Sequence, residues 1–427
     1  MNILIVGAGG REHAFAWKLK QSSHCHDLFI APGNAGTATC GKNWPIGVND
    51  FASLSTACIE NNVELVLVGP EEPLVNGIYD FFKKNKATRN ILVIGPSKDA
   101  ARLEGSKAYA KAFMEKYHIP TAAYKGFTLK TYLEGISYIK SHPLPIVLKA
   151  DGLAAGKGVV ICESLIEALA EFELMILRSK FGEAGKKVVV EEFLTGIELS
   201  VFVLTDGKNY VLLPEAKDYK KIGEGEKGLN TGGMGAVSPV PFADAAFMQK
   251  VIKKVIEPTI AGLQQEIPDY KGFVFFGLMK TNDEPYLIEY NCRMGDPETE
   301  VVIPRLQNDF VSLLTATANQ KLNEITIETD PRFAATVMAV SGGYPGEYEK
   351  GLPITGLQEK PIEGSIIFQS GTMLENGEVL TNGGRVLAIT SYGDTIREAV
   401  EQSVYMLEQI YFGGIYYRND IGFEFTQ

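Results

Sequence analysis

Apolar runs alternate with helical patterns over the first hundred residues. Four of these runs have the length and composition of buried strands: residues 2–6, 28–30, 65–68 and 91–94. Strands that alternate with helices predict a parallel sheet with helices on its faces. Ligands of such sheets bind where the strands end at their carboxyl edge. Glycine-containing turns at 7–11, 31–36 and 69–71 occupy three of these ends.

The rest of the chain shows further periodic segments. Helices are predicted at 108–117, 164–179, 245–266 and 395–410, and strands at 145–149, 159–161, 187–194, 198–203, 272–279 and 285–291. From about residue 331 the pattern is rich in strands and turns, including a hairpin-like turn at 381–385. A second glycine-dense loop is predicted at 228–236.

A loop rich in glycine and lysine, KADGLAAGKG at 149–158, lies between two predicted strands. Glycines let backbone N–H groups approach a phosphate, and the lysines add positive charge. We therefore predict a lid over the phosphates of a nucleotide, although this stretch alone also fits an ordinary glycine-rich hairpin. It is not a Walker P-loop, because three residues rather than four separate Gly152 from Gly156, and Gly158 replaces the metal-binding Ser or Thr.

The first turn resembles a dinucleotide-binding fingerprint only in part. Gly7 and Gly9 match the G-x-G-x-x-G pattern, but Glu12 stands at the third glycine position. The second strand also lacks the acid that would hold a ribose hydroxyl, so a nicotinamide-dependent dehydrogenase is disfavoured. A helix that begins at Gly10 and Arg11 could still bind a single phosphate.

Polar residues alternate along the strand at 285–291. Period 2 places Glu289, Asn291 and Arg293 on one face of it. A carboxylate and an amide oxygen side by side suit magnesium, and an arginine offers a planar fork to a carboxylate or phosphate. Adjacent Glu191 and Glu192 are predicted to point to opposite faces of their strand. We interpret the strand at 285–291 as part of a metal and phosphate site.

Composition narrows the classes of function. The net charge of −11 argues against binding to nucleic acid or to an anionic membrane surface. No apolar run approaches the ~18–20 residues of a membrane span, and the N-terminus lacks signal-peptide features. Five scattered cysteines without C-x-x-C spacing suit a reducing cytoplasm and offer no zinc site. We interpret His24, Cys25 and His26 as a solvated turn.

The order of features along the chain resembles that of an ATP-grasp enzyme. Lys107 comes first, and it is followed by the lysine-bearing loop, the strand with two adjacent glutamates and the strand with the Glu-x-Asn pattern. The segments GAGGREHA, APGNAG, VGPE, LEGSKA, KADGLAAGKGV, NTGGMGA and EYNCRMGDPET resemble the glycinamide ribonucleotide synthetase family, over essentially the whole chain. The resemblance implies an α/β fold in three parts. These are a Rossmann-like N-terminal domain at 1–103, an ATP-grasp domain at 104–328 with a lid at about 122–192, and a β-rich α+β domain at 329–427.

The family's activity is the ATP-dependent ligation of 5-phosphoribosylamine to glycine, through glycyl phosphate, in de novo purine biosynthesis. The products are glycinamide ribonucleotide, ADP and phosphate, and the cofactors implied are ATP with Mg²⁺ or Mn²⁺. The resemblance further implies a cytoplasmic monomer that binds small-molecule substrates. Another ATP-grasp carboxylate–amine ligase and a non-catalytic ATP-binding module remain alternatives.

The resemblance also implies roles for individual residues. ATP would be bound by Lys107, Lys149, Gly152, Gly156, Lys157, Gly158, Glu191, Glu192, Phe193, Leu194 and Glu198, and the metal by Glu289 and Asn291. The substrates would contact Gly10, Arg11, Glu12, Asn34, Glu71, Asp218, Arg293 and Asp296. Arg293, with Lys149 and Asp218, is expected to act in catalysis, Arg293 on the glycine carboxylate and Asp218 on its amine. Tyr219 departs from the family's histidine, and Gln369 and Ser370 from a usual His-Ala pair.

Overall fold

The computed structural model describes residues 1–153, 158–357 and 362–425. Its N-terminal part is a five-stranded parallel sheet in the order β3-β2-β1-β4-β5. The strands are β1 (Ile3–Gly7), β2 (Leu28–Pro32), β3 (Lys42–Asn43), β4 (Leu65–Val68) and β5 (Leu92–Ile94). The helices are α1 (Gly10–Lys20), α2 (Phe51–Glu60), α3 (Glu71–Asn76), α4 (Ile78–Lys84) and α5 (Arg102–Gly105). The predicted parallel sheet is confirmed.

A central antiparallel sheet follows, in the order β11-β10-β16-β17. Its strands are β10 (Ile197–Thr205), β11 (Tyr210–Leu212), β16 (Gly272–Thr281) and β17 (Glu284–Asn291). The associated helices are α6 (Lys107–Lys116), α9 (Ala245–Val251), α10 (Glu257–Glu266), α11 (Thr299–Arg305) and α12 (Phe310–Ala318). A π-helical segment at Ile252–Ile256 joins α9 to α10, so the predicted long helix is present but is not α-helical throughout.

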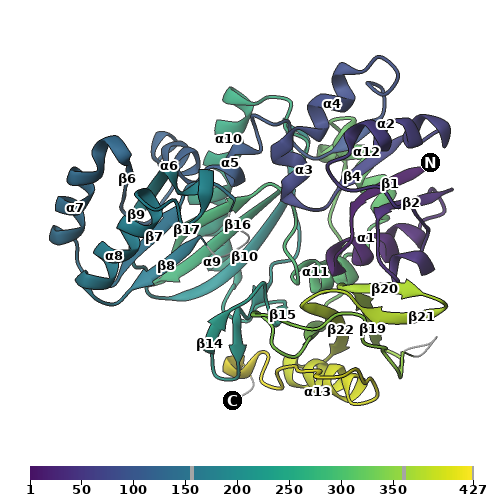
Figure 1. Ribbon diagram of the computed structural model, residues 1–427. Coiled ribbons are helices and arrows are strands. Elements are labelled where there is room, and N and C mark those ends of the chain that lie inside the picture. Colours follow the sequence, from purple (N-terminus) through teal and green to yellow (C-terminus); the bar gives the residue numbers. More distant parts are fainter. Residues whose placement is uncertain (154–157, 358–361, 426–427) are drawn as a thin grey trace.

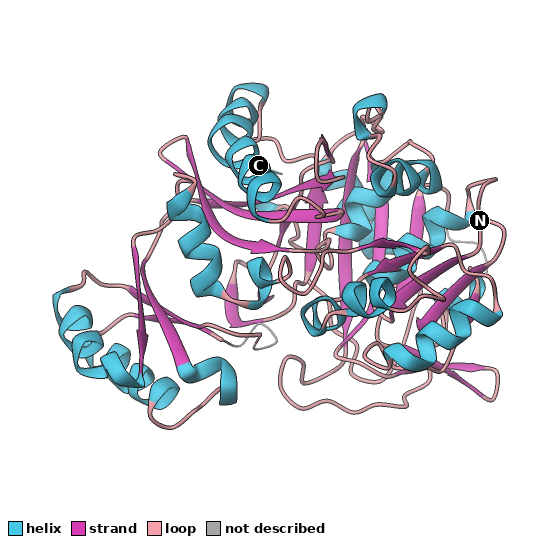
Figure 2. Ribbon diagram, turned by 90° about the horizontal axis from the view of Figure 1, so that it is seen from above, coloured by secondary structure: helices cyan, strands magenta, loops and turns pink. Residues whose placement is uncertain are grey.

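The lid sheet projects to one side of the molecule, at the left of Figure 1, with the strand order β6-β9-β7-β8. Its strands are β6 (Tyr124–Thr128), β7 (Ile146–Ala150), β8 (Val159–Cys162) and β9 (Lys187–Glu192). Helices α7 (Tyr132–Ser141) and α8 (Leu165–Ile176) cover it and enclose a separate apolar core. Figure 2 shows this lobe standing apart from the rest of the chain.

The C-terminal sheet has the order β12-β15-β18-β22-β19. Its strands are β12 (Lys217–Asp218), β15 (Gly235–Ser238), β18 (Phe333–Val340), β19 (Ser365–Gln369) and β22 (Arg385–Gly393), and α13 (Ile396–Leu407) packs on it. Strands β12 and β15 precede residue 328, so this sheet spans the boundary predicted between 328 and 329. That boundary remains a prediction.

Two short ribbons complete the fold, β13 (Lys221–Gly223) with β14 (Lys227–Asn230) and β20 (Thr372–Glu375) with β21 (Glu378–Thr381). The 3-10 turns are Thr37–Thr39, Leu129–Thr131, Gly182–Lys186, Leu322–Glu324 and Phe423–Phe425. The hairpin expected at 381–385 was wrong, because β21 pairs with β20 while β22 pairs with β18 and β19. The glycine-dense loop expected at 228–236 is shortened by β14 and β15.

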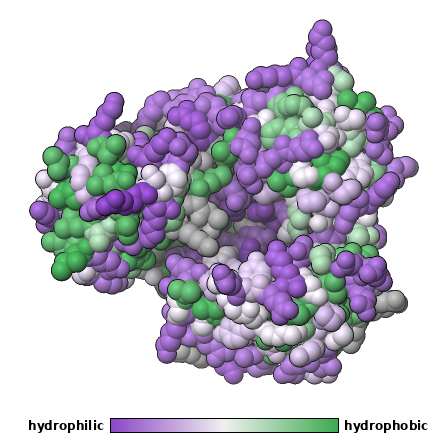
Figure 3. Space-filling model, viewed as in Figure 1, coloured by the Kyte–Doolittle hydropathy of each residue, from purple (hydrophilic) through white to green (hydrophobic). Residues whose placement is uncertain are grey.

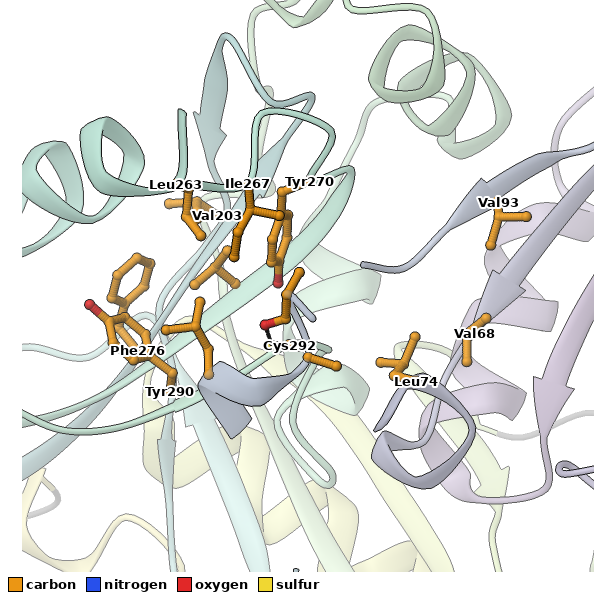
Figure 4. Close-up of a cluster of buried hydrophobic side chains, with 14 of the residues drawn as sticks. Val68, Leu74, Val93, Val203, Leu263, Ile267, Tyr270, Phe276, Tyr290 and Cys292 are labelled. Carbon is orange, nitrogen blue, oxygen red and sulfur yellow. Dashed lines mark hydrogen bonds between the residues drawn. The ribbon is translucent and has the colours of Figure 1, made fainter. Parts of the chain in front are cut away.

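Two apolar clusters each combine side chains of the N-terminal and central parts. In one of them, Phe15 of α1 stacks on Phe273 of β16, with ring centroids 6.0 Å apart. Figure 4 shows the other, in which Val68, Leu74 and Val93 from the N-terminal part face side chains of the central sheet and α10. Among the described residues, the structure has no helix long and apolar enough to cross a membrane.

His13 joins the N-terminal part to the C-terminal sheet. Its Nδ1 accepts a hydrogen bond from the backbone N–H of Gln369 at 2.8 Å, and its ring packs edge-on against Phe368. Burial lowers the pKa of His13 to about 4. The folded protein therefore holds this imidazole neutral.

We expect this histidine to weaken the fold in acid. As the pH falls from 6.5 towards 4, the unfolded chain takes up a proton that the folded chain refuses, so stability is lost by up to ~3 kcal/mol. Chemical denaturation of the wild type and His13→Gln at pH 7 and pH 4.5 measures this effect. The stability difference between the two proteins should shrink at the lower pH, and an unchanged difference would contradict the assignment.

Candidate active site

Two adjoining cavities lie between the lid sheet and the central sheet. One has a volume of about 220 Å³ and the other about 300 Å³. Lys149 and Glu191 of the lid sheet and Glu289 of the central sheet line both, so the cavities form one cleft. Figure 3 shows the molecule hollowed between the lid lobe and the lobes of the N- and C-terminal sheets.

The smaller cavity brings together four residues that the sequence predicted to act together. Lys107, Lys149, Glu289 and Asn291 all line it, although they come from α6, β7 and β17. β17 lies more than a hundred residues further along the chain than α6 and β7. The four side chains are therefore neighbours in the fold, and their roles toward metal and phosphate remain a prediction.

A β-bulge on β17 sets the orientation of the metal-binding candidates. Gly277 pairs with Glu289 but Leu278 pairs with Leu287, so Ile288 is the extra residue. Beyond the bulge, the buried Tyr290 shares a hydrogen bond of 2.7 Å between its hydroxyl and that of Thr259, and Glu289, Asn291 and Arg293 all line the smaller cavity. The predicted common face of Glu289, Asn291 and Arg293 is thus present.

The donor set of β17 fits a hard divalent cation. Within the described part of the chain, no group forms a hydrogen bond or ion pair with the Glu289 carboxylate, and the Asn291 amide oxygen accepts only from Arg293, at 3.3 Å. No group of three His, Cys, Asp or Glu side chains suited to a metal occurs among these residues. Mg²⁺ needs no such group, because it commonly takes one or two protein oxygens and completes its shell with phosphate oxygens and water.

The glycine-lysine loop holds the start of α6. Asp151 accepts hydrogen bonds from Ser106 Oγ at 3.0 Å and from the backbone N–H of Ala108 at 2.6 Å. An anion at a helix N-terminus is favourable, and it compensates for the cation at the first helical position. Lys107 Nζ lies 3.5 Å from the carbonyl oxygen of Gly152. This arrangement keeps Lys107 beside the cavity.

Residues Gly156 and Lys157 of the predicted lid loop lie outside the described residues. Gly158 lines the smaller cavity, and its carbonyl oxygen accepts from the backbone N–H of Ala150 at 2.8 Å. A side chain at Gly152 would come within 2.8 Å of the Ala184 Cβ, so this position needs glycine for a close approach.

Lys149 shares a buried carboxylate with a lysine that the sequence analysis missed. Glu191 Oε2 lies 3.0 Å from Lys149 Nζ and 3.0 Å from Lys111 Nζ. The other oxygen, Glu191 Oε1, has no hydrogen-bond partner among the described residues. Glu192 is half-exposed and accepts from the backbone N–H of Ala123 at 2.8 Å, and both glutamates line the larger cavity. Lys111 follows Lys107 by one helical turn, a spacing that could have signalled a shared face.

The larger cavity contains the remaining ATP-binding candidates. Glu192, Phe193, Leu194 and Glu198 line it together with Lys220. Glu198 Oε2 lies 2.5 Å from Lys220 Nζ, and this lysine lowers the pKa of the Glu198 carboxyl. The cavity has apolar walls on one side and this ion pair on the other.

A pair of buried acids lies behind Lys220. Asp218 Oδ1 is 4.0 Å from Lys220 Nζ, but Asp218 does not line either cavity. Burial raises the pKa of the Asp218 carboxyl, and burial followed by the Asp218 charge raises the pKa of Glu298 to about 7. Glu298 was not predicted, since nothing in the spacing of its motif signals that Asp218 would be brought beside it.

Arg293 is held by two acids at the edge of the smaller cavity. One of its terminal nitrogens lies 2.8 Å from Glu104 Oε1, and its Nε lies 3.4 Å from Glu71 Oε2, within ion-pair distance but without hydrogen-bond geometry. Glu104 also accepts from the backbone N–H of Cys292 at 2.8 Å. The guanidinium therefore has a fixed position, and its role toward glycine remains a prediction.

The turn at the start of α1 lies outside both cavities. The backbone N–H of Gly9 donates to Glu12 Oε2 at 2.6 Å, and that of Arg11 approaches Asp296 Oδ2 at 3.5 Å. Buried Glu300 packs against Gly10, where a side chain would collide with its carboxyl. Carboxylates rather than free donors thus surround this turn.

Asn34 is also engaged by the chain itself. Its amide nitrogen donates to the carbonyl oxygens of Ala8 at 2.8 Å and Gln369 at 2.8 Å, and its amide oxygen accepts from Thr37. The phosphate contact predicted near Gly10, Arg11 and Asn34 remains untested, but the donors it would use are occupied here.

Tyr219 is a core residue rather than a cleft residue. It is fully buried, donates a hydrogen bond from its hydroxyl to Glu424 Oε2 at 2.9 Å, and packs under Lys217 Nζ at 3.9 Å from the ring centroid. The tyrosine that departs from the family pattern therefore ties strand β12 to the C-terminal segment.

Removing only the hydroxyl should spare catalysis. We expect Tyr219→Phe to lower the free energy of unfolding by about 1 kcal/mol, the usual net value of one hydrogen bond, and to change kcat less than twofold. Thermal unfolding and steady-state kinetics measure both effects. A tenfold fall in kcat with unchanged stability would instead place this hydroxyl in the reaction.

Comparison with known proteins gives consistent matches along the whole chain. The family described as phosphoribosylglycinamide synthetase matches with its N domain at residues 1–104, its ATP-grasp (A) domain at 105–299 and its C domain at 334–424. Phosphoribosylamine–glycine ligase of Vibrio vulnificus is 44% identical over 426 residues, which cover 99% of this chain and 98% of that protein. The ligase of Pseudomonas aeruginosa is also 44% identical, over 425 residues with the same coverage.

Solved structures agree with these matches. The crystal structure of phosphoribosylamine–glycine ligase from Thermotoga maritima has a TM-score of 0.84 at 35% identity, and covers 99% of this chain and 100% of that chain. A biotin carboxylase from Campylobacter jejuni has a TM-score of 0.72 at 15% identity, with 99% of this chain and 94% of that chain covered, and so shares the fold.

Proposed function

The chain belongs to the phosphoribosylglycinamide synthetase family, and on this premise we propose which of its residues carry the reaction. It is an enzyme that joins 5-phosphoribosylamine to glycine with the use of ATP, forming glycinamide ribonucleotide in purine biosynthesis. The observation that supports the residue assignment best is the meeting of Lys107, Lys149, Glu289 and Asn291 in one cavity.

Glu289 and Asn291 would hold the divalent cation, Mg²⁺ or Mn²⁺, facing the triphosphate. The ion would offset charge as the γ-phosphoryl group moves. Lys107 and Lys149 would bind the phosphates, since both lysines line the same cavity as Glu289 and Asn291. The loop that contains Gly152 and Gly158 would cover them and exclude water, which would hydrolyse an acyl phosphate.

The nucleoside would occupy the larger cavity. Adenine would lie against Phe193 and Leu194, and Glu198 would accept hydrogen bonds from the ribose hydroxyls. Glu191 also lines this cavity, and its Oε1, which has no partner among the described residues, would accept from an amino group of the base. An unsatisfied buried carboxylate oxygen is costly, so a ligand that donates to it gains affinity.

Glycine would be activated at the edge of the smaller cavity. Arg293 would bind its carboxylate, because the guanidinium fork is held in place by Glu104 and Glu71 and faces Asn291. The carboxylate attacks the γ-phosphorus, ADP leaves, and glycyl phosphate forms. The ribosylamine nitrogen then attacks the acyl carbon, and phosphate leaves. Asp218 would bind the glycine amine from behind Lys220.

The second substrate would enter between the N-terminal and central parts. Glu71, Glu12 and Asp296 would contact its ribose and amine, with Gly10, Arg11 and Asn34 as the predicted phosphate contacts. We propose that the enzyme acts as a monomer in the cytoplasm, without nucleic acid or membrane partners.

A coupled assay for ADP tests this function. ADP should be released only when ATP, a divalent cation, glycine and phosphoribosylamine are all present, and glycinamide ribonucleotide should form in equal amount. ADP release that is indifferent to glycine would favour a ligase for another acid. Tight ATP binding without any turnover would favour a non-catalytic ATP-binding module.

A further inference from the structure

Lys111 is a buried lysine that the reaction described above does not use. It lies on α6 one turn after Lys107, and its side chain is 2% exposed. Its Nζ lies 3.0 Å from Glu191 Oε2 and donates a hydrogen bond to Thr121 Oγ1 at 2.7 Å. Burying a charged ammonium is expensive, so its position calls for a physical reason.

The burial of Lys111 is explained by Glu191, which lies between Lys111 and Lys149. Its Oε2 also lies 3.0 Å from Lys149 Nζ, so two buried lysines face one buried carboxylate. A single lysine beside a buried carboxylate would form a closed pair and keep little attraction for a further anion. With two lysines, the group retains one net positive charge at the wall shared by both cavities.

We propose that Lys111 is a positioning residue for ATP binding: it neutralises Glu191 and thereby leaves the ammonium of Lys149 available to the phosphates. The inference deepens the proposed function of the same cleft and rests on it. Lys111 itself contacts no phosphate in this scheme. Thr121 holds the Lys111 ammonium in place, because the threonine hydroxyl accepts from Lys111 and in turn donates to the carbonyl oxygen of Leu287 at 2.6 Å.

The charge of Lys111 depends on pH near neutrality. Glu191 and Glu192 of β9 and Lys149 of β7 act on it, and its Nζ lies 5.5 Å from the ring centroid of Tyr124 on β6. Burial lowers the pKa of Lys111 to about 8, and Glu191 only partly opposes that effect. Above this pH Lys111 loses its proton, Glu191 pairs with Lys149 alone, and the group of these three side chains loses its net positive charge.

The test is isothermal titration calorimetry of ATP binding at fixed Mg²⁺, at pH 7 and pH 9. For the wild type, affinity should fall by about tenfold over this range, because binding requires the proton on Lys111. For Lys111→Met, affinity should already be lower at pH 7 by on the order of 10- to 100-fold, because Lys149 would be tied to Glu191 and its charge-assisted contact with the phosphates weakened, and affinity should depend much less on pH.

Lys116→Met is the matched control, because Lys116 lies on the same helix, is exposed, and pairs with Glu266 at 2.6 Å. It should retain wild-type affinity at both pH values. Equal ATP affinity and equal pH dependence in Lys111→Met and the control would overturn the proposal. If Lys111→Met does not fold, a wild-type affinity that is unchanged between pH 7 and pH 9 overturns it alone. A wild type that does not bind ATP at either pH would instead refute the proposed function.

Discussion

Replacing Glu289 with glutamine is expected to lower ADP formation by on the order of a thousandfold or more, since phosphoryl transfer depends on the divalent cation that this carboxylate would hold. The fold should survive, because Glu289 is half-exposed and has no hydrogen-bond or ion-pair partner among the described residues. Steady-state ADP release at saturating substrates measures the loss, and thermal unfolding checks the fold.

The matched control lies on the same strand. Glu284→Gln removes a carboxylate at the far end of β17, where it pairs with Lys254 on the surface, and should leave turnover unchanged. Raising the Mn²⁺ or Mg²⁺ concentration should restore part of the Glu289→Gln activity. Full turnover in that variant at ordinary metal concentration would refute the metal assignment.

Lys149→Met should raise the KM for ATP by about 100-fold, because a charge-assisted contact with a phosphate is worth up to ~3 kcal/mol in a buried site. The KM for glycine should change much less, since Arg293 rather than Lys149 is assigned to the amino acid. Initial rates with each substrate varied in turn separate the two effects. Equal increases in both KM values would count against the phosphate role.

Lys140→Met serves as its control, because Lys140 is an exposed lysine on α7 of the same lobe. The variant should keep both KM values. Lys149→Arg provides a second comparison, since it preserves the positive charge but places it on a longer planar group. Partial recovery of ATP affinity with arginine would show that charge, and not only the shape of lysine, is needed.

Local patterns were sufficient to predict the elements of the site. The strand that carries Glu289 and Asn291 follows from alternation of polar and apolar residues, and the strands on either side of the predicted lid loop, β7 and β8, follow from their apolar runs. Patterns of this kind also predicted the parallel N-terminal sheet. Each of these features depends on residues close together in the chain.

Long-range pairing was not predictable in the same way. The bulge at Ile288 depends on the partner strand β16, and the alternation along β17 gives no sign of it. The prediction of a hairpin at 381–385 was wrong because β22 pairs with β18 and β19 and not with β21. Local turn chemistry cannot decide between partners that are distant in sequence.

The buried charges show the same limit. Lys111 reads as an ordinary polar position on a helix, and only the approach of β9 to α6 places Glu191 beside it. The fold brings Glu298 near Asp218, which lies eighty residues earlier in the chain, and the charge of Asp218 helps to raise the pKa of Glu298. Such residues are recognised from the fold, because their surroundings come from several segments.

The two apolar clusters that the N-terminal and central sheets share also limit where the chain can be cut into fragments that fold. A fragment that ends at residue 103 would separate Phe15 from Phe273 and remove the side chains that pack against α10 and β16. Apolar surface would then be exposed to water on both fragments. Chimaeras that exchange this portion between relatives must therefore transplant both facing surfaces together. The lid lobe encloses its own apolar core, so it could be exchanged between relatives without a matching apolar surface on the rest of the chain.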